Sequence, residues 1–254
     1  RPGRSDRFYD ATAWSLPYTY RVRAWMSRSP VASTPVDTTW RSTATAPDSA
    51  RYGYAIEGGT EAGYRLLAAL LRDSVRVWHQ PGAFRSGSSR VGRGSFVARV
   101  VGNGPRVHAL VRQHAAATGA PVVALSGAGV DEGFDLGSNL VFPVRQPSVA
   151  IIAGPGVSGQ SAGYAWYTMD QRLRYPATIL DPTAVSGAML DAYNVIILPS
   201  VQGAFFERML GEGGRDRLTS WVRAGGTLVT LEASSAWVAT ERVGLSRLRV
   251  RRDS

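Results

Sequence analysis

The sequence contains no cysteine and no lysine. The lack of cysteine excludes disulfides, thiolate catalysis and cysteine-ligated metals within these 254 residues. No apolar run approaches the ~18 residues of a membrane-spanning helix, so no such span is expected. Hydrophobic residues make up 44% of the chain and charged residues 19%, which is typical of a globular protein and too apolar for a disordered one.

Because lysine is absent, the 29 basic side chains are all arginine, and with 19 acidic residues they give a net charge of +10. We interpret so uniform a bias as an effect of genome composition. Arginine is a good phosphate partner. The basic stretch 247–252, however, lacks the interleaved aromatic residues that are typical of base stacking. We therefore expect no nucleic-acid partner and keep that function only as a minor alternative.

The chain divides into three segments by composition and pattern. Residues 1–51 form a lead-in that begins with aromatic residues and becomes rich in Ser, Thr and Pro, which is typical of loops. Residues 52–147 and 148–254 each show the pattern strand–helix–strand–strand–helix–strand. We therefore predict two modules, an accessory α/β module at 52–147 and a second α/β module at 148–254.

The predicted strands are apolar on both faces and alternate with helical patterns. In the second module they are 149–153, 177–180, 195–198 and 227–231. Such strands are typical of a parallel sheet that helices cover on both sides. We therefore predict an α/β protein with a doubly wound, mostly parallel sheet of flavodoxin-like type.

Residues 154–159 read GPGVSG, a G-x-G-x-x-G motif that directly follows a predicted strand. Asp181 ends the next predicted strand, 22 residues beyond Gly159, and this context is that of a dinucleotide-binding turn. A strand-to-helix turn also needs glycine for structural reasons alone, and Pro155 removes one amide that could bind phosphate. We favour the structural turn. Ligand binding at the sheet's carboxyl edge remains the alternative, with Gly154, Gly156, Ser158, Gly159 and Asp181 as its residues.

The turn after strand 227–231 is the place where glutaminase-like folds carry a nucleophile. Here it holds Glu232, Ala233, Ser234 and Ser235. Ser234 and Ser235 are weak catalytic candidates because no histidine follows them, and a serine without a base is a poor nucleophile. Capping of a following helix is the favoured role, and a degenerate serine hydrolase is kept as an alternative.

The three histidines, His79, His108 and His114, do not form a zinc motif. None has an acidic residue three positions later, and His108 and His114 are six apart, so a helix would direct them to different sides. We expect no metal site and no cofactor in this chain.

Several motifs resemble one protein family. They are FYDATAWSLPY at 8–18, DLGS at 135–138, SAGYAW at 161–166, MDQR at 169–172 and VRAGGTLVTL at 222–231. Together they resemble the C-terminal, non-catalytic region of bacterial M14-family zinc carboxypeptidase-like proteins. The resemblance covers most of the chain.

This resemblance implies a class I glutamine amidotransferase-like module, a three-layer sandwich, preceded by an accessory half. The family's zinc ligands and general-base glutamate lie in an upstream peptidase domain, and no residue here matches their motif. The resemblance therefore implies a non-catalytic module that positions or supports that domain, with zinc bound only there and with a peptide as the substrate. It also implies export to the periplasm or the outside of the cell. The chain departs from active glutaminases because it lacks their cysteine and offers no histidine at the elbow.

Overall fold

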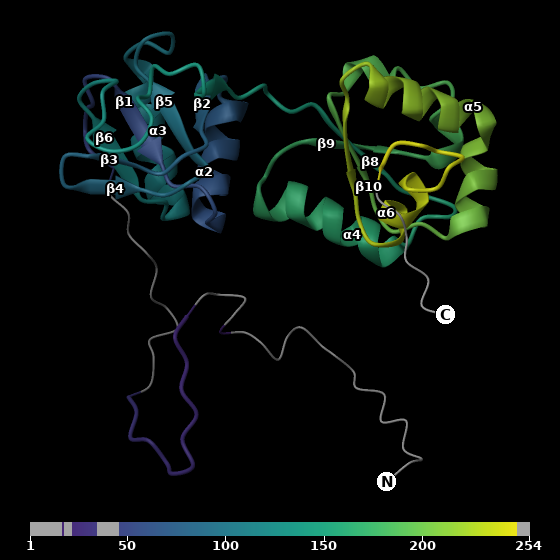
Figure 1. Cartoon of the computed structure of the whole chain (residues 1–254), viewed down its shortest axis with the longest axis horizontal. Coiled ribbons are helices and arrows are strands. Elements are labelled where there is room, and N and C mark those ends of the chain that lie inside the picture. Colours follow the sequence, from purple (N-terminus) through teal and green to yellow (C-terminus); the bar gives the residue numbers. More distant parts are fainter. Residues whose placement is uncertain (1–16, 18–21, 35–45, 248–254) are drawn as a thin grey trace. The chain divides into compact units, whose positions relative to one another are not determined.

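The computed structural model describes residues 17, 22–34 and 46–247. Residues 1–40 and 41–254 form separate units, and only the second contains a described sheet (Figure 1). Most of the aromatic opening of the predicted lead-in lies outside the described residues. Residues 22–34 are exposed and adopt neither helix nor strand.

The first sheet is antiparallel, with strand order β6-β1-β5-β2-β7. This corrects the prediction of a mostly parallel sheet for residues 52–147. A helix joins β1 to β2 and another joins β5 to β6, as predicted, but a third strand separates the members of each pair. Such a split β-α-β arrangement makes every neighbouring pair antiparallel. The strands are β1 (Gly53–Ile56), β2 (Val77–Gln80), β5 (Ser95–Arg99), β6 (Val122–Leu125) and β7 (Phe142–Pro143).

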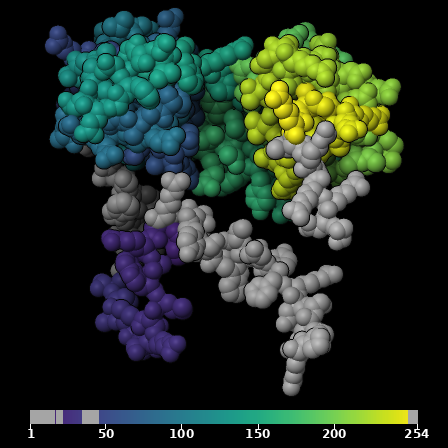
Figure 2. Space-filling model, viewed as in Figure 1, coloured from purple at the N-terminus to yellow at the C-terminus, as the bar shows by residue number. Residues whose placement is uncertain are grey.

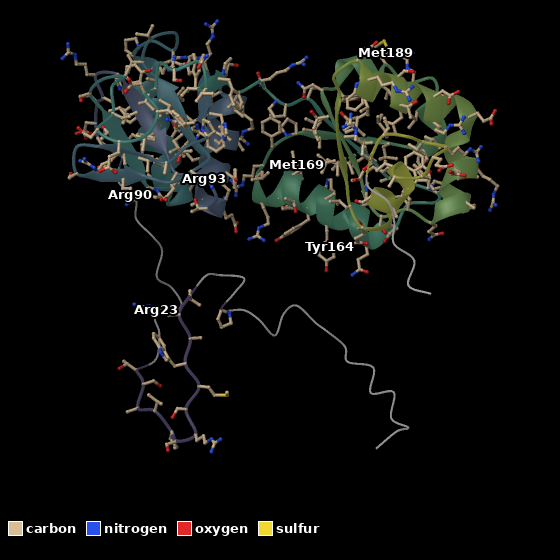
Figure 3. The ribbon with its side chains drawn as sticks, in the orientation of Figure 1. Arg23, Arg90, Arg93, Tyr164, Met169 and Met189 are labelled. Atoms are coloured by element: carbon tan, nitrogen blue, oxygen red, sulfur yellow. The ribbon has the colours of Figure 1, made fainter. Side chains whose placement is uncertain are left out.

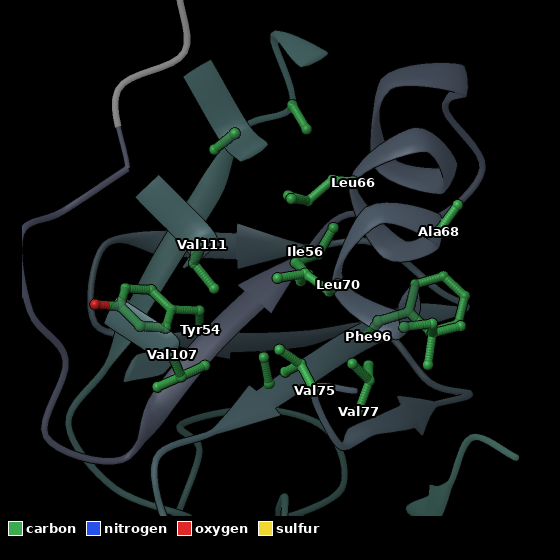
Figure 4. Packing of buried hydrophobic residues seen from close by; sticks show 14 of the residues in the cluster. Tyr54, Ile56, Leu66, Ala68, Leu70, Val75, Val77, Phe96, Val107 and Val111 are labelled. Carbon is green, nitrogen blue, oxygen red and sulfur yellow. The ribbon is translucent and has the colours of Figure 1, made fainter. Parts of the chain in front are cut away.

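Helices α2 (Glu61–Arg72) and α3 (Arg106–Thr118) bury their apolar sides against one face of this sheet. Figure 4 shows Leu66 and Leu70 of α2 among side chains of the sheet and of α3. Thr60 caps α2 by accepting a hydrogen bond from the Gly63 amide at 3.1 Å. The other face packs beneath the hairpin of β3 (Phe84–Ser86) and β4 (Ser89–Val91).

The second sheet is parallel and four-stranded, with strand order β11-β10-β8-β9, which confirms the parallel sheet predicted for residues 148–254. Its strands are β8 (Val149–Ile152), β9 (Ala177–Leu180), β10 (Val195–Leu198) and β11 (Thr227–Thr230). Its helical segments are α4 (Gly159–Tyr167), the π-helical turn η2 (Thr168–Arg172), η3 (Pro182–Ala184), η4 (Leu190–Ala192), α5 (Gly203–Arg223) and α6 (Ala233–Val238).

Both faces of the parallel sheet are covered. Ile152 and Leu198 form one cluster with Phe206 and other residues of α5. Val195, on the alternate face, belongs to a cluster that includes Met169 of η2. Because successive residues of a strand face opposite sides, the continuous apolar strands of this sequence require a helical layer on each side.

The helices of the parallel part have two irregularities. Helix α5 is interrupted at Gly211, whose φ of 69° and ψ of 172° are non-helical. The single helix predicted at 161–174 instead passes from α4 into η2. Figure 3 shows Tyr164 pointing away from α4, in agreement with its 65% exposure. No helix among the described residues is both long and apolar enough to cross a membrane.

Candidate functional site

The GPGVSG turn joins β8 to α4 at the carboxyl edge of the parallel sheet. Gly154 has φ of +145° and Gly156 has φ of +83°. A Cβ on Gly154 would lie 2.6 Å from an Asp181 carboxylate oxygen, and one on Gly156 would lie 2.6 Å from the Cα of Phe206. Close packing against the neighbouring loop and against α5 therefore accounts for both glycines without a ligand.

Backbone hydrogen bonds tie the same turn to the loop after β10. The Ser158 amide donates to the Ser200 carbonyl at 2.8 Å, and the Gln202 amide donates to the Gly156 carbonyl at 2.7 Å. Ser158 also caps α4, where its hydroxyl accepts from the Ser161 amide at 3.3 Å. The Ser158 and Ser161 amides, which a pyrophosphate could use at a helix start, are thus already engaged within the protein.

Asp181 lies where the dinucleotide motif predicts it, directly after β9. Its Oδ1 accepts hydrogen bonds from the Thr183 amide at 2.8 Å and the Thr183 hydroxyl at 2.6 Å, so it caps η3. These bonds from Thr183 lower the pKa of the Asp181 carboxyl. Gly159, the last glycine of the motif, has open space around it. The structure brings Gly154 and Asp181 together, but as packing partners.

The turn after β11 has the most unusual backbone at this edge. Glu232 has φ of 53° and ψ of −122°, a conformation that side-chain-bearing residues rarely adopt and that costs about 1–3 kcal/mol. A strained strand-to-helix turn of this kind is the backbone of a nucleophile elbow. The side chain of Glu232 is exposed. The sequence predicted a strand-to-helix turn here, which the structure contains, but it singled out the serines as candidates and not Glu232.

Ser234 and Ser235 do not present hydroxyls of equal accessibility. Ser234 is fully buried, and its Oγ lies 2.8 Å from the Leu198 carbonyl oxygen and 2.7 Å from that of Leu231. It also accepts from the Leu231 amide at 2.8 Å. Ser235 is exposed, and its hydroxyl lies 3.0 Å from that of Thr230. Ser234 therefore fastens the elbow to β10 and is out of reach of a substrate.

We expect Glu232→Gly to stabilise the chain by about 1 kcal/mol. Glycine adopts this conformation without steric cost, and the gain is partly offset by the greater freedom of glycine in the unfolded chain. Urea unfolding of the two proteins measures the difference, with Glu241→Gly as a control at an ordinary backbone position. A variant less stable than the parent would contradict the strain at this elbow.

A cavity of about 660 Å³ opens beside the elbow. Residues at the start of α5 and along α6 line it, and both helices belong to the part of the chain coloured green to yellow in Figure 2. Gly203 and Ala204 line one side, and Ala233 and Ala236 line the other. None of the five residues predicted at the GPGVSG turn and Asp181 lines it. The open space at this edge therefore lies at β10 and β11 rather than at β8 and β9.

Glu207 and Trp237 belong to this cavity and also to an adjacent one of about 380 Å³. The Trp237 indole N–H donates to Glu207 Oε1 at 3.1 Å, and Arg242 donates to Glu207 Oε2 at 3.2 Å. Trp237 is 4% exposed and meets Phe206 edge to face, with ring centroids 5.2 Å apart. The wall shared by the two cavities is thus closely packed and carries a carboxylate that two side chains hydrogen-bond.

The three histidines lie in the antiparallel part and are engaged separately. His108 Nδ1 lies 2.7 Å from the Tyr54 hydroxyl, and His114 Nε2 lies 2.7 Å from an Asp73 carboxylate oxygen. His79 packs against the rings of Phe96 and Phe142. Burial is the main factor that raises the pKa of Tyr54. Across residues 46–247, no group of three His, Cys, Asp or Glu side chains is arranged to hold a metal ion.

No family model, no curated protein and no solved structure matches the chain.

Proposed function

We propose that this chain is a non-catalytic accessory module that positions or supports a zinc carboxypeptidase-like domain of the same, exported polypeptide. The second half of the chain would be the doubly wound, flavodoxin-like module of the class I glutamine amidotransferase type. The strand order β9-β8-β10-β11 supports this architecture, because it places the second strand beside the first and adds the later strands on the other side.

One observation carries the proposal. The elbow after β11 keeps the strained backbone of a nucleophile position, yet Glu232 occupies it and Ser234 is buried beneath it. All three histidines of the sequence are at positions 79–114, outside the parallel part. Acyl transfer at such an elbow needs a nucleophile with an adjacent base. The elbow thus has a backbone conformation suited to a nucleophile, but its described residues do not include a nucleophile with an adjacent base.

A second candidate function is the binding of a small ligand at the carboxyl edge of the parallel sheet. The cavity of about 660 Å³ favours it, since ligand pockets measure about 300–1,000 Å³ and such folds bind ligands at this edge. Because of where the cavity lies, we expect a ligand to contact Glu207, Trp237 and the elbow rather than the GPGVSG turn. The two functions are compatible, because an accessory module can recruit a substrate.

The test compares this chain with the full product of its open reading frame. We expect zinc and removal of C-terminal residues from peptides only in the longer protein, because no zinc site is arranged among the described residues. Stoichiometric zinc or peptidase activity in the 254-residue chain would overturn the proposal, as would a longer protein with neither.

A fluorophosphonate probe tests the remaining alternative, a degenerate serine hydrolase. We expect no labelling of the folded chain, and Ser234→Ala to lower the free energy of unfolding by about 1–3 kcal/mol because it removes the hydrogen bonds that fasten the elbow. Labelling that is lost in Ser235→Ala, which leaves Ser234 in place, would identify a working serine and contradict the non-catalytic assignment.

A further inference from the structure

A small basic hollow lies among α2, α3 and the residues at the end of η2. Its volume is about 110 Å³, and its lining includes Arg65, Arg72, Arg172, Arg174 and His114. No acidic residue among those described lines it. Four arginines that line so small a space make its surroundings positively charged. We call this feature the arginine hollow.

Only one of the four arginines has a described carboxylate partner. Arg172 pairs with Glu61, and its Nε lies 3.2 Å from Glu61 Oε1. Arg72 donates to the backbone carbonyl of Arg174, which is a neutral acceptor. Among residues 46–247, neither Arg65 nor Arg174 forms an ion pair. Arg65, Arg72 and Arg174 therefore have no carboxylate partner within the described part of the chain.

Local structure gathers these side chains from distant parts of the sequence. Arg65 and Arg72 lie seven residues apart on α2, about two helical turns, and so share a face. His114 of α3 also lines the hollow, and its Nε2 is held by Asp73. The imidazole therefore already has a carboxylate partner. The positive charge that a ligand could meet in the hollow comes from the arginines.

The π-helical turn η2 supplies Arg172, and the residues directly after it supply Arg174. The Leu173 amide donates to the Thr168 carbonyl at 3.0 Å, and the Tyr175 amide donates to the Met169 carbonyl at 2.8 Å. Arg174, between them, adopts a left-handed φ of 50°. Such wide turns are rare and are frequent at functional sites. The MDQR motif at 169–172 thus forms the turn that brings Arg172 and Arg174 to the hollow.

We propose that the arginine hollow binds a tetrahedral oxyanion of the phosphate class, either free phosphate or the phosphate group of a small phosphomonoester. The planar fork of guanidinium matches phosphate oxygens in pairs. The volume of about 110 Å³ is below the ~300 Å³ at which pockets for whole drug-sized ligands begin. The phosphate group alone therefore occupies the hollow. This inference does not rest on the function proposed above.

Calorimetric titration of the 254-residue chain tests the site, with inorganic phosphate and O-phosphoserine as probes at constant ionic strength. We expect saturable one-to-one binding. Arg65→Gln and Arg174→Gln should each weaken it about 10- to 100-fold, as expected for loss of a charge-assisted hydrogen bond. The matched control is Arg90→Gln, at an exposed arginine of β4 labelled in Figure 3, which should bind as the parent does. Circular dichroism verifies that each variant is folded.

The two probes separate the sources of the phosphate group. Tighter binding of O-phosphoserine supports a phosphorylated ligand, and tighter binding of inorganic phosphate supports the free ion. Arg65→Lys keeps the charge but loses the fork, so it should lie between the parent and Arg65→Gln. The proposal is overturned if phosphate gives no more heat than chloride, or if Arg65→Gln and Arg174→Gln weaken binding no more than Arg90→Gln.

Discussion

Gly156→Ala should lower the free energy of unfolding by about 2–6 kcal/mol. The new methyl group would lie 2.6 Å from the Cα of Phe206, so backbone must move, and overpacking of this kind costs about 1–3 kcal/mol. The φ of +83° adds about 1–3 kcal/mol of strain for a residue with a Cβ. Urea or thermal unfolding monitored by circular dichroism measures the loss.

Gly159→Ala is the matched control within the same motif. Gly159 is the first residue of α4, and beyond its chain neighbours and its own helix backbone no atom lies within 4 Å of a Cβ placed there. Alanine should therefore be neutral or stabilise by up to ~1 kcal/mol, because it favours the helix and restricts the unfolded chain. Equal losses at both glycines would show that packing against α5 does not explain the motif.

Trp237→Ala should destabilise the chain by about 3–5 kcal/mol, the usual cost of removing a buried aromatic side chain. Trp237 is 4% exposed, packs on Phe206 and forms the wall shared by the two cavities. Its removal also takes the indole donor from Glu207. Denaturant unfolding followed by circular dichroism measures the effect, since the substitution removes one of the seven tryptophans and so alters the fluorescence of the chain itself.

Trp237→Phe separates packing from hydrogen bonding. Most of the buried ring remains, and Arg242 still pairs with Glu207, so the expected loss is only about 1 kcal/mol. If Trp237→Phe were as unstable as Trp237→Ala, the bond to Glu207 rather than the packing would hold α6 in place. If neither changed stability, α6 would not be part of the cooperative core.

The candidate site shows where sequence reasoning succeeded and where it could not. Position was predictable, because the turns after β8 and β11 follow continuous apolar strands. The roles of the residues were not. Glycine is needed at position 156 because a Cβ there would collide with Phe206, which is 50 positions away. The hydroxyl of the buried Ser234 is hydrogen-bonded to the carbonyl of Leu198. Contacts over such distances leave no local signal.

The two sheets make the same point at the level of the fold. Helix and strand patterns were readable in both halves, because their periods report which sides of an element are buried. They do not report which strands are neighbours. In the parallel part β8 and β9 adjoin directly, whereas β5 separates β1 from β2 in the antiparallel part. The same predicted order of strands and helices thus corresponds to two different sheets.

The sequence by itself determined the α/β class, the positions of the main strands and helices, and the exclusion of thiol chemistry. These follow from composition and local periodicity. Only the tertiary structure decided the antiparallel order of the first sheet, the strain at Glu232 and the gathering of Arg65 with Arg174 in one hollow. The physical reason is that long-range packing decides which elements become neighbours. Several elements have similar apolar faces, so the local pattern of one element does not identify the element that it packs against.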